Sequence, residues 1–419
     1  MVSKIKEVRA EERLTGRGWG IVWTTVVTED GSVGTGTTSA GVSVGAHEPV
    51  HLYDGGERLH GMGALKAVEN VNSVIAPKIR GMNVTQQQQI DDLMVKLDGT
   101  PNKARLGANA ILSVSLAVLN AATKSVGLPL YRYIGGANAR IIPVSASHAM
   151  AGSTRFGGPA PGKVGGGKPS YCWMTYGTKS FREGVEAATD VQHEFRRIFQ
   201  EKYGIEHLNL GEIVLSRGVV ESDREIMDVM VESINNLGYR DKIGIYIDAA
   251  AGCFLDESRN KFVGLFSKED KTKEDLVEYY KRIVVDYPVV VLEDPLDEED
   301  YEGHALLAKE LGVEILGDDL FTTNIERLKH GISMHAANAI LIKTRQAGTV
   351  TEAMDVIELA HKNGYAACMI GEPDMAVGMG TGQGRLGGPE SPAALRVVDI
   401  ERELGDRARF LGKTALRLR

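Results

Sequence analysis

The sequence contains few cysteines. Cys172, Cys253 and Cys368 lie far apart, without a CxxC motif or the spacing of a Cys/His metal site, so we expect reduced thiols in an intracellular protein. The first residues, MVSKIKEVRAEERL, carry charges where a secretion signal needs an apolar segment. The sequence also lacks an uninterrupted apolar run of the ~18 residues that a membrane helix requires. These absences predict a cytoplasmic location and no membrane partner.

The chain also lacks an excess of positive charge. Its 48 Lys and Arg residues are outnumbered by 56 Asp and Glu residues, which gives a formal net charge of −8. A mildly acidic surface argues against nucleic acid or an anionic membrane as a partner. It leaves room for a local basic pocket that binds a small anion.

Two nucleotide-binding motifs are missing. No GxGxxG follows an early strand, and the glycine-rich segment 152–168 has the wrong order of Gly, Lys and Ser/Thr for a P-loop. This segment is almost without large apolar side chains, which is typical of a disordered surface loop. A mobile lid that orders over a substrate is the alternative interpretation.

The 419 residues are enough for a barrel and a second domain. Residues 1–140 predict a small α+β domain, with strands at 21–28 and 32–38 on either side of a Glu-Asp-Gly turn. The segment 106–124 predicts a helix that is apolar nearly all round, as expected for a helix buried between layers.

Residues 141–419 show a different pattern, in which short apolar runs alternate with amphipathic helices. Such repetition predicts a parallel sheet closed into a (β/α) barrel, with an open doubly wound sheet as the main alternative. The expected strands include 243–248, 289–294, 313–319, 339–343 and 366–370, and the expected helices include 273–284, 300–311 and 350–363.

Charged side chains end four of these strands. Asp248, Glu293, Asp318 and Lys343 each follow an apolar run. Because the carboxyl ends of barrel strands meet at one face, these side chains should lie together. Three carboxylates repel one another unless a cation neutralises them, and oxygen ligands favour Mg²⁺. The pattern therefore predicts a magnesium site with Asp248, Glu293 and Asp318 as ligands.

Lys343 has a separate predicted role. Nearby positive charge and partial burial both lower the pKa of a lysine. A lysine beside a metal ion can then remove a proton α to a carboxylate, while the metal stabilises the enediolate that forms.

Long stretches of the chain resemble enolase. The most specific are VVVLEDPLDEEDYEGH (289–304), ILGDDLFTTN (315–324), LIKTRQAGTVTEA (341–353) and LDGTPNKARLGANAILSVSLAV (97–118). The resemblance implies the enolase fold, in which a small N-terminal α+β capping domain precedes a modified (β/α)8 TIM-type barrel. It also implies Asp248, Glu293 and Asp318 as ligands of one or two Mg²⁺ ions, Lys343 as the base, and a homodimer or higher homo-oligomer.

Other positions depart from the family pattern. The lid S-G-A-S-T-G reads AGVSVG (40–45), in which Ser43 matches the serine that reaches a second magnesium. The catalytic glutamate of Q-E-F is missing, since that segment aligns with Pro169-Ser170-Tyr171, and the second carboxylate of D-E-G-G-F-A-P is replaced by Ile213. The phosphate-binding segment S-H-R-S is largely deleted between Ile370 and Met375, and Arg385 replaces a lysine.

These departures shape the expected function. We expect a Mg²⁺-dependent lyase that abstracts the proton α to the carboxylate of a small phosphorylated or phosphonate-bearing acid. Three alternatives stay open: phosphopyruvate hydratase, an enzyme similar to carboxyphosphonoenolpyruvate synthase, and a non-catalytic binding protein on an enolase scaffold. The predicted catalytic residues are Lys343, Arg385 and His148, and the predicted substrate-binding residues are Ser43, Arg345, Gln346 and Arg385.

Overall fold

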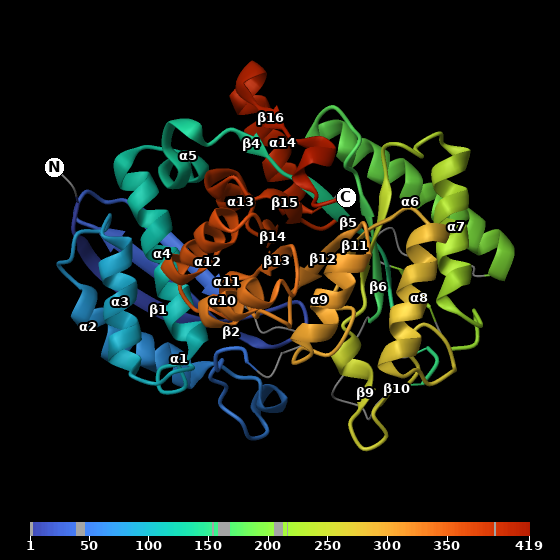
Figure 1. Cartoon of the computed structure of the whole chain (residues 1–419). Helices are drawn as coiled ribbons and strands as arrows, with labels where there is room; N and C mark the ends of the chain where they lie inside the picture. Colours follow the sequence, from blue (N-terminus) through green and yellow to red (C-terminus); the bar gives the residue numbers. More distant parts are fainter. Residues whose placement is uncertain are drawn as a thin grey trace. The chain divides into compact units, whose positions relative to one another are not determined.

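The computed structural model describes residues 3–38, 47–152, 155–157, 168–204, 213–215, 217–388 and 391–419. It divides into two compact units. Unit 1 contains residues 1–136, 322–325 and 343–358, and unit 2 contains residues 137–321, 326–342 and 359–419. Figure 1 shows the chain coloured from the N-terminus (blue) to the C-terminus (red).

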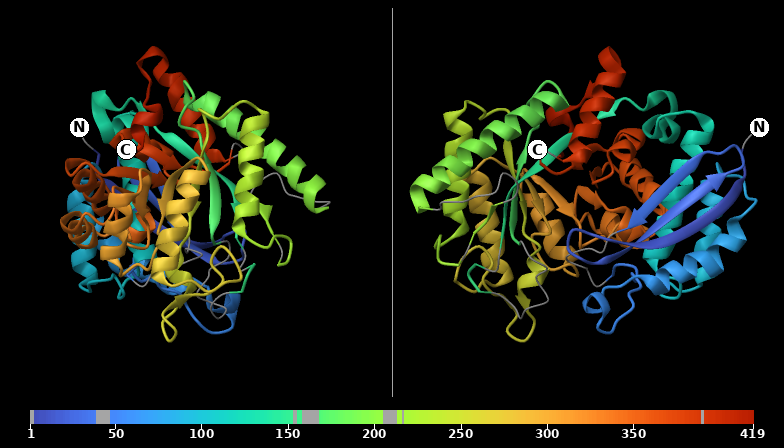
Figure 2. Two further views of the ribbon diagram at one scale, coloured as in Figure 1. Left: turned by 45° about the vertical axis from the view of Figure 1, so that its right-hand side comes forward. Right: turned by 180° about the vertical axis from the view of Figure 1, so that it is seen from behind.

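Unit 1 is built on an antiparallel three-stranded sheet in the order β1-β2-β3. These strands span Ile5–Leu14, Gly20–Thr28 and Val33–Thr38, and they are blue in Figure 2. Helix α4 (Ala108–Val126) packs against β2 and β3. The packing is close because Gly34 and Gly36 face the helix: an added Cβ would lie 2.2 Å from the carbonyl oxygens of Ala117 and Ser113, respectively.

Helix α4 matches the buried helix expected over 106–124. By length and composition alone, its 19 residues would also be able to cross a membrane. Most of the helix is buried within the protein, as expected for the core helix of unit 1. Its side chains join a continuous apolar core with residues of β1, β2 and α3.

Unit 1 also contains several shorter elements. They are η1 (Arg58–Gly61), α1 (Leu65–Asn70), η2 (Val71–Ile75), α2 (Ala76–Ile79), α3 (Gln87–Asp98), α5 (Leu130–Gly135) and α11 (Thr344–Ala347).

Unit 2 contains a closed eight-stranded barrel, because its last strand pairs with its first. In order around the barrel, the strands are β5 (Val144–Ala151), β6 (Ser170–Met174), β8 (Gly244–Asp248), β11 (Val289–Glu293), β12 (Glu314–Gly317), β13 (Ala339–Ile342), β14 (Ala366–Ile370) and β15 (Gly382–Arg385). Strand β6 runs antiparallel to both neighbours, whereas the other pairings are parallel. The closure of β15 on β5 excludes the open doubly wound sheet.

Helices separate most of the barrel strands in the chain. They are α6 (Phe181–Tyr203), α7 (Asp223–Asn236), α8 (Lys273–Asp286), α9 (Tyr301–Glu310), α10 (Ile325–Met334), α12 (Val350–Lys362), α13 (Pro373–Met379) and α14 (Pro392–Leu404). Local signals fix where several begin. The Thr272 hydroxyl accepts from the amide of Asp275, whose carboxylate accepts from the amide of Thr272, which is a capping box at the start of α8.

The described part of unit 2 also contains short strands. They are β4 (Ile141–Ile142), β7 (Ile213–Val214), β9 (Leu255–Asp256), β10 (Lys261–Phe262) and β16 (Arg409–Phe410). The predicted combination of a small α+β unit and a TIM-type barrel is confirmed. Strand β1 was missed, because IKEVRAEERL alternates charged and apolar residues too irregularly to predict a strand.

Candidate active site

The three predicted metal ligands lie at the carboxyl ends of neighbouring strands. Asp248 ends β8, Glu293 ends β11, and Asp318 follows the last residue of β12. The strand register places Glu293 opposite Asp248 on one side and opposite Leu316 on the other. The side chains of all three are buried. The structure therefore brings the predicted carboxylates together at one rim of the barrel.

Arg385 joins two of these carboxylates. It is the last residue of β15, and its Nη1 lies 2.9 Å from Oδ2 of Asp248 and 2.6 Å from Oε2 of Glu293. The same Glu293 oxygen accepts a hydrogen bond from the hydroxyl of Tyr246. Arg385 is thus an internal counter-ion of the acidic rim.

Lys168 is a second counter-ion, which the sequence did not predict. Its ammonium contacts Oδ2 of Asp248, and the hydroxyl of Ser170 lies 3.5 Å from the same oxygen. Strand β6 runs antiparallel to β8, so the residue pair Ser170–Asp248 stands at the start of one strand and the end of the other. The one feature of the sequence that pointed to this place was the alignment of Pro169-Ser170-Tyr171 with the family segment that carries the catalytic glutamate.

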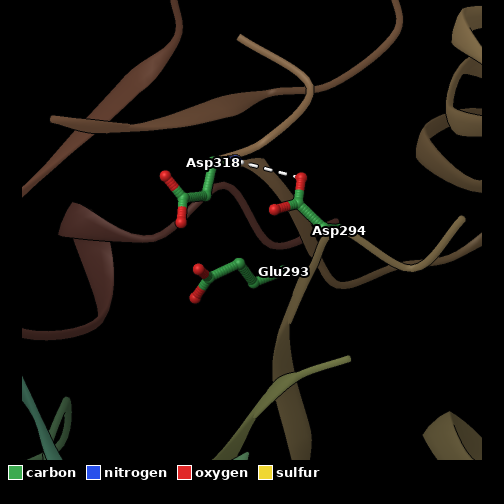
Figure 3. Close-up of side chains that lie close together, drawn as sticks. All are labelled: Glu293, Asp294 and Asp318. Carbon is green, nitrogen blue, oxygen red and sulfur yellow. Dashed lines mark hydrogen bonds between the residues drawn. The ribbon is translucent and has the colours of Figure 1, made fainter. Parts of the chain in front are cut away.

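Asp294 also lies in the acidic group but has a different role (Figure 3). One oxygen each from Glu293, Asp294 and Asp318 lies within 4.8 Å of the others. The carboxylate of Asp294 accepts hydrogen bonds from the backbone amides of Asp318, Asp319 and Leu320 at 3.1, 2.8 and 3.3 Å. Asp294 therefore shapes the turn that presents Asp318, and its oxygens are already engaged.

The electrostatics differ between neighbouring acids. Burial raises the pKa of Glu293 to about 7, with Asp248 and Asp318 acting in the same direction against Arg385 and Lys168. Burial also opposes ionisation of Asp248, but the cations of Lys168 and Arg385 hold the pKa of this carboxyl below its usual value. Asp248 is therefore a carboxylate at neutral pH.

Unpartnered oxygens show that the rim fits a divalent metal ion. Oδ1 of Asp248 and Oε1 of Glu293 are buried and have no hydrogen-bond partner among the described residues. Such atoms are rare in folded proteins, where buried polar groups are almost always satisfied. Carboxylate oxygens are the donors that Mg²⁺ prefers. Asp248 and Glu293, with Asp318 beside them, are the residues that would hold the ion.

Lys343 follows β13, the strand next to β12 in the barrel, and the residue is 8% exposed. Its backbone amide donates to Oγ1 of Thr323 at 3.0 Å within unit 1. Arg345 and Gln346, two predicted substrate-binding residues, both donate to the carboxylate of Glu48, which was not among the predicted site residues. Arg345 Nη1 lies 2.5 Å from one oxygen of Glu48, and Gln346 Nε2 lies 3.1 Å from the other.

His148, a predicted catalytic residue, lies inside β5. Its Nδ1 is 3.7 Å from Sγ of Cys172. Burial, with help from the charges of Arg385 and Lys168, lowers the pKa of His148 to about 3. The imidazole is therefore neutral at physiological pH and is a poor source of a proton.

Two predictions lie outside the described residues. They concern Ser43 and most of the glycine-rich segment 152–168. Within that segment, Arg155 is described: it forms a buried bidentate ion pair with Asp223, to which the hydroxyl of Tyr171 also donates.

Together, the closed barrel and its acidic rim define a TIM-type barrel protein with a buried acidic cluster at the carboxyl ends of the strands that could hold a metal ion. Comparison with known families gives a more specific result. The family model "Enolase, N-terminal domain" matches residues 5–134, and "Enolase, C-terminal TIM barrel domain" matches residues 169–418. The chain belongs to the enolase family.

Several archaeal proteins named "Enolase" are similar to it over nearly their whole length. The protein of Methanocaldococcus jannaschii is 40% identical over 417 residues, covering 96% of each chain. Those of Thermococcus gammatolerans and Methanopyrus kandleri are also 40% identical, and the alignments cover 98% and 97% of this chain and 97% of each relative.

Proposed function

We propose that this protein is a divalent-metal-dependent lyase that removes the proton α to the carboxylate of a small phosphorylated acid. The reversible dehydration of 2-phosphoglycerate to phosphoenolpyruvate is the first reaction to test, because the similar proteins are named "Enolase". The observation that carries the proposal is the pair of buried, unpartnered carboxylate oxygens on Asp248 and Glu293.

Each residue has a role that follows from its charge and position. Lys343, directly after β13, is the proposed base that takes the α-proton. A metal ion held by Asp248, Glu293 and Asp318 would stabilise the negative charge that develops on the substrate carboxylate. The guanidinium of Arg385 is planar and permanently charged, and it is the proposed partner of the substrate's anionic group.

The test separates proton removal from dehydration. Purified protein with Mg²⁺ is incubated with 2-phosphoglycerate in deuterated water, and both α-deuterium exchange and phosphoenolpyruvate are measured. We expect exchange in the wild type and in Lys329→Ala, whose lysine is exposed on α10, and a loss of at least 100-fold in Lys343→Ala. Absence of exchange on this and related phosphorylated or phosphonate-bearing acids, with no Mg²⁺-dependent thermal shift, would favour a non-catalytic binding protein.

A second candidate is an enzyme with the same proton abstraction but another substrate or second step. The observation that favours it is the hydroxyl of Ser170 and the ammonium of Lys168 at the start of β6, where the family pattern has a glutamate. Under this candidate, exchange occurs on a phosphonate-bearing acid, as for carboxyphosphonoenolpyruvate synthase, and phosphoenolpyruvate does not accumulate from 2-phosphoglycerate.

The proposal also includes a cellular location and an oligomeric state. A cytoplasmic homodimer or higher homo-oligomer is the state that the family resemblance implies. Analytical ultracentrifugation of the purified protein measures the oligomeric state directly.

A further inference from the structure

A cavity of about 500 Å³ lies inside unit 2, at the amino-terminal end of the barrel strands. Its wall includes Ala337 and Asn338, which directly precede β13, and Tyr365, which directly precedes β14. The acidic rim lies at the carboxyl ends of strands that run parallel to these two, so the cavity is at the opposite end of the barrel. Small-molecule sites in proteins have volumes of about 300–1,000 Å³, and this cavity falls within that range.

One side of the cavity is apolar. Ala305 and Ala308 are three residues apart on α9 and therefore share one face of that helix, and Met334 is the last residue of α10. The short alanine side chains leave the space open, and a methionine side chain adapts readily to the shape of a ligand. These three residues form a surface for the apolar part of a bound molecule.

The other side of the cavity carries positive charge. Lys309 and Arg419 line it, and none of the described lining residues is an Asp or a Glu. Neither cation has an ion-pair partner among the described residues, because Glu310, the acid next to Lys309, lies 2.8 Å from Lys281 instead. Nη1 of Arg419 is 3.5 Å from the carbonyl oxygen of Lys309, so the two residues are neighbours. Two neighbouring cations without an acid attract an anion.

Asn338 adds a hydrogen-bond donor to the wall. Its Oδ1 accepts from the backbone amide of Ile315 at 2.9 Å, whereas its Nδ2 has no hydrogen-bond partner among the described residues. The planar guanidinium of Arg419 is able to donate two parallel hydrogen bonds to a carboxylate. A donor-rich side opposite an apolar side fits a molecule that has a carboxylate at one end and an apolar group at the other.

We propose that this cavity is a second ligand site, which binds a small carboxylic acid with an apolar body. The carboxylate pairs with Lys309 and Arg419, and the apolar body lies against Ala305, Ala308 and Met334. The site is separate from the acidic rim and does not depend on the proposed function.

Lys309 also has a position that stabilises its own helix. It lies in the last turn of α9, where a cation interacts favourably with the carbonyl end of the helix dipole. That interaction contributes to folding stability and requires no ligand. A direct binding measurement therefore distinguishes a ligand site from a purely stabilising cation.

Fluorine NMR measures binding with two matched probes. The first is 4-(trifluoromethyl)benzoate, and the second is 4-(trifluoromethyl)benzyl alcohol, which has a similar body but no charge. The variants are Ala305→Trp, which fills the cavity, and the double variant Lys309→Met/Arg419→Met, which removes both cations. Lys329→Met is the matched control, because Lys329 pairs with Glu326 on the exposed face of α10. Circular dichroism confirms that each variant is folded.

We expect the wild type and Lys329→Met to bind the benzoate saturably and about tenfold more tightly than the alcohol, because hydrogen bonds to a charged group are strong. The double variant should bind the two probes with equal, weak affinity. Ala305→Trp should bind neither probe.

Four results would overturn the proposal. They are equal affinity of the wild type for both probes, unchanged benzoate affinity in the double variant, benzoate binding that persists in Ala305→Trp, and no saturable binding at millimolar probe concentrations. If Ala305→Trp does not fold, Ala305→Leu fills part of the cavity and provides the same test.

Discussion

Nη1 of Arg385 lies 2.6 Å from Oε2 of Glu293, and both side chains are buried. Removing one partner of a buried ion pair leaves the other charge without compensation, which destabilises the folded protein by about 3–5 kcal/mol. We therefore expect Arg385→Met to lower the free energy of unfolding by about that amount. Mg²⁺ should raise the melting temperature of this variant more than that of the wild type, because the ion restores positive charge at the rim.

Thermal unfolding with and without MgCl₂ measures both effects. Arg385→Lys is the control, since it keeps the charge but not the planar group that reaches two carboxylates. Equal melting temperatures for the wild type and Arg385→Met in the absence of metal would contradict the role of Arg385 as an internal counter-ion.

Asp294 and Asp318 should respond differently to substitution. Asp294→Ala removes the acceptor of three backbone amides in the turn after β12, so we expect it to destabilise the protein by about 2–3 kcal/mol without metal. Asp318→Asn should change this stability little and should strongly reduce the thermal shift produced by Mg²⁺. Urea unfolding and metal-dependent thermal shifts distinguish the two, and an unchanged Mg²⁺ shift in Asp318→Asn would remove Asp318 from the ligand set.

The ion pair between Arg155 and Asp223 is a stability element of unit 2. Its side chains are 1% and 0% exposed and form two hydrogen bonds, at 2.7 and 2.8 Å. We expect Arg155→Met to lower the free energy of unfolding by about 3–5 kcal/mol. The control is Arg182→Met, because Arg182 and Glu186 form an exposed pair on α6 that contributes at most about 0.5 kcal/mol. Similar urea midpoints for the two variants would show that the buried pair contributes little.

Glu314 should make stability depend on pH. It is fully buried at the start of β12, accepts from Gln383 Nε2 and the amide of Arg417, and burial raises its pKa to about 7. When the pKa of a carboxyl is raised in the folded state, the group stabilises the fold most at pH values below its unfolded pKa, near 4.5. This stabilisation is lost as the pH rises through about 7.

Glu314→Gln stays neutral and removes this dependence. Between pH 5 and pH 8 we expect the wild type to lose about 2 kcal/mol relative to the variant. Urea unfolding at both pH values measures the difference, and parallel stability curves would show that Glu314 titrates normally.

The sequence predicted much of the barrel because the pattern is local. Apolar runs such as VVVLED (289–294) and AILIK (339–343) end in charged residues, and the structure has strands at Val289–Glu293 and Ala339–Ile342. Repetition of strand and helix places consecutive parallel strand ends on one rim, so the gathering of Asp248, Glu293 and Asp318 followed from the order of elements. Their identity as ligands remains a prediction.

Other features depended on partners distant in the chain. The contacts of Asp248 with Lys168 and Arg385 span 80 and 137 residues, and local pattern carries no information about such pairs. Closure of the barrel likewise required β15 to meet β5. Strand β1 has a weak pattern of its own and is held by its ladder with β2.

The sequence by itself therefore determined the enolase family, the order of strands and helices, and the placement of three acids at strand ends. Only the tertiary structure decided which oxygens of those acids are free. Glu293 and Asp294 are adjacent in the chain. Asp294 accepts hydrogen bonds from backbone amides, whereas Glu293 forms an ion pair with Arg385 and has one buried oxygen without a hydrogen-bond partner among the described residues. The physical reason is that hydrogen bonding and charge compensation depend on which groups meet in space, and residue type alone does not contain that information.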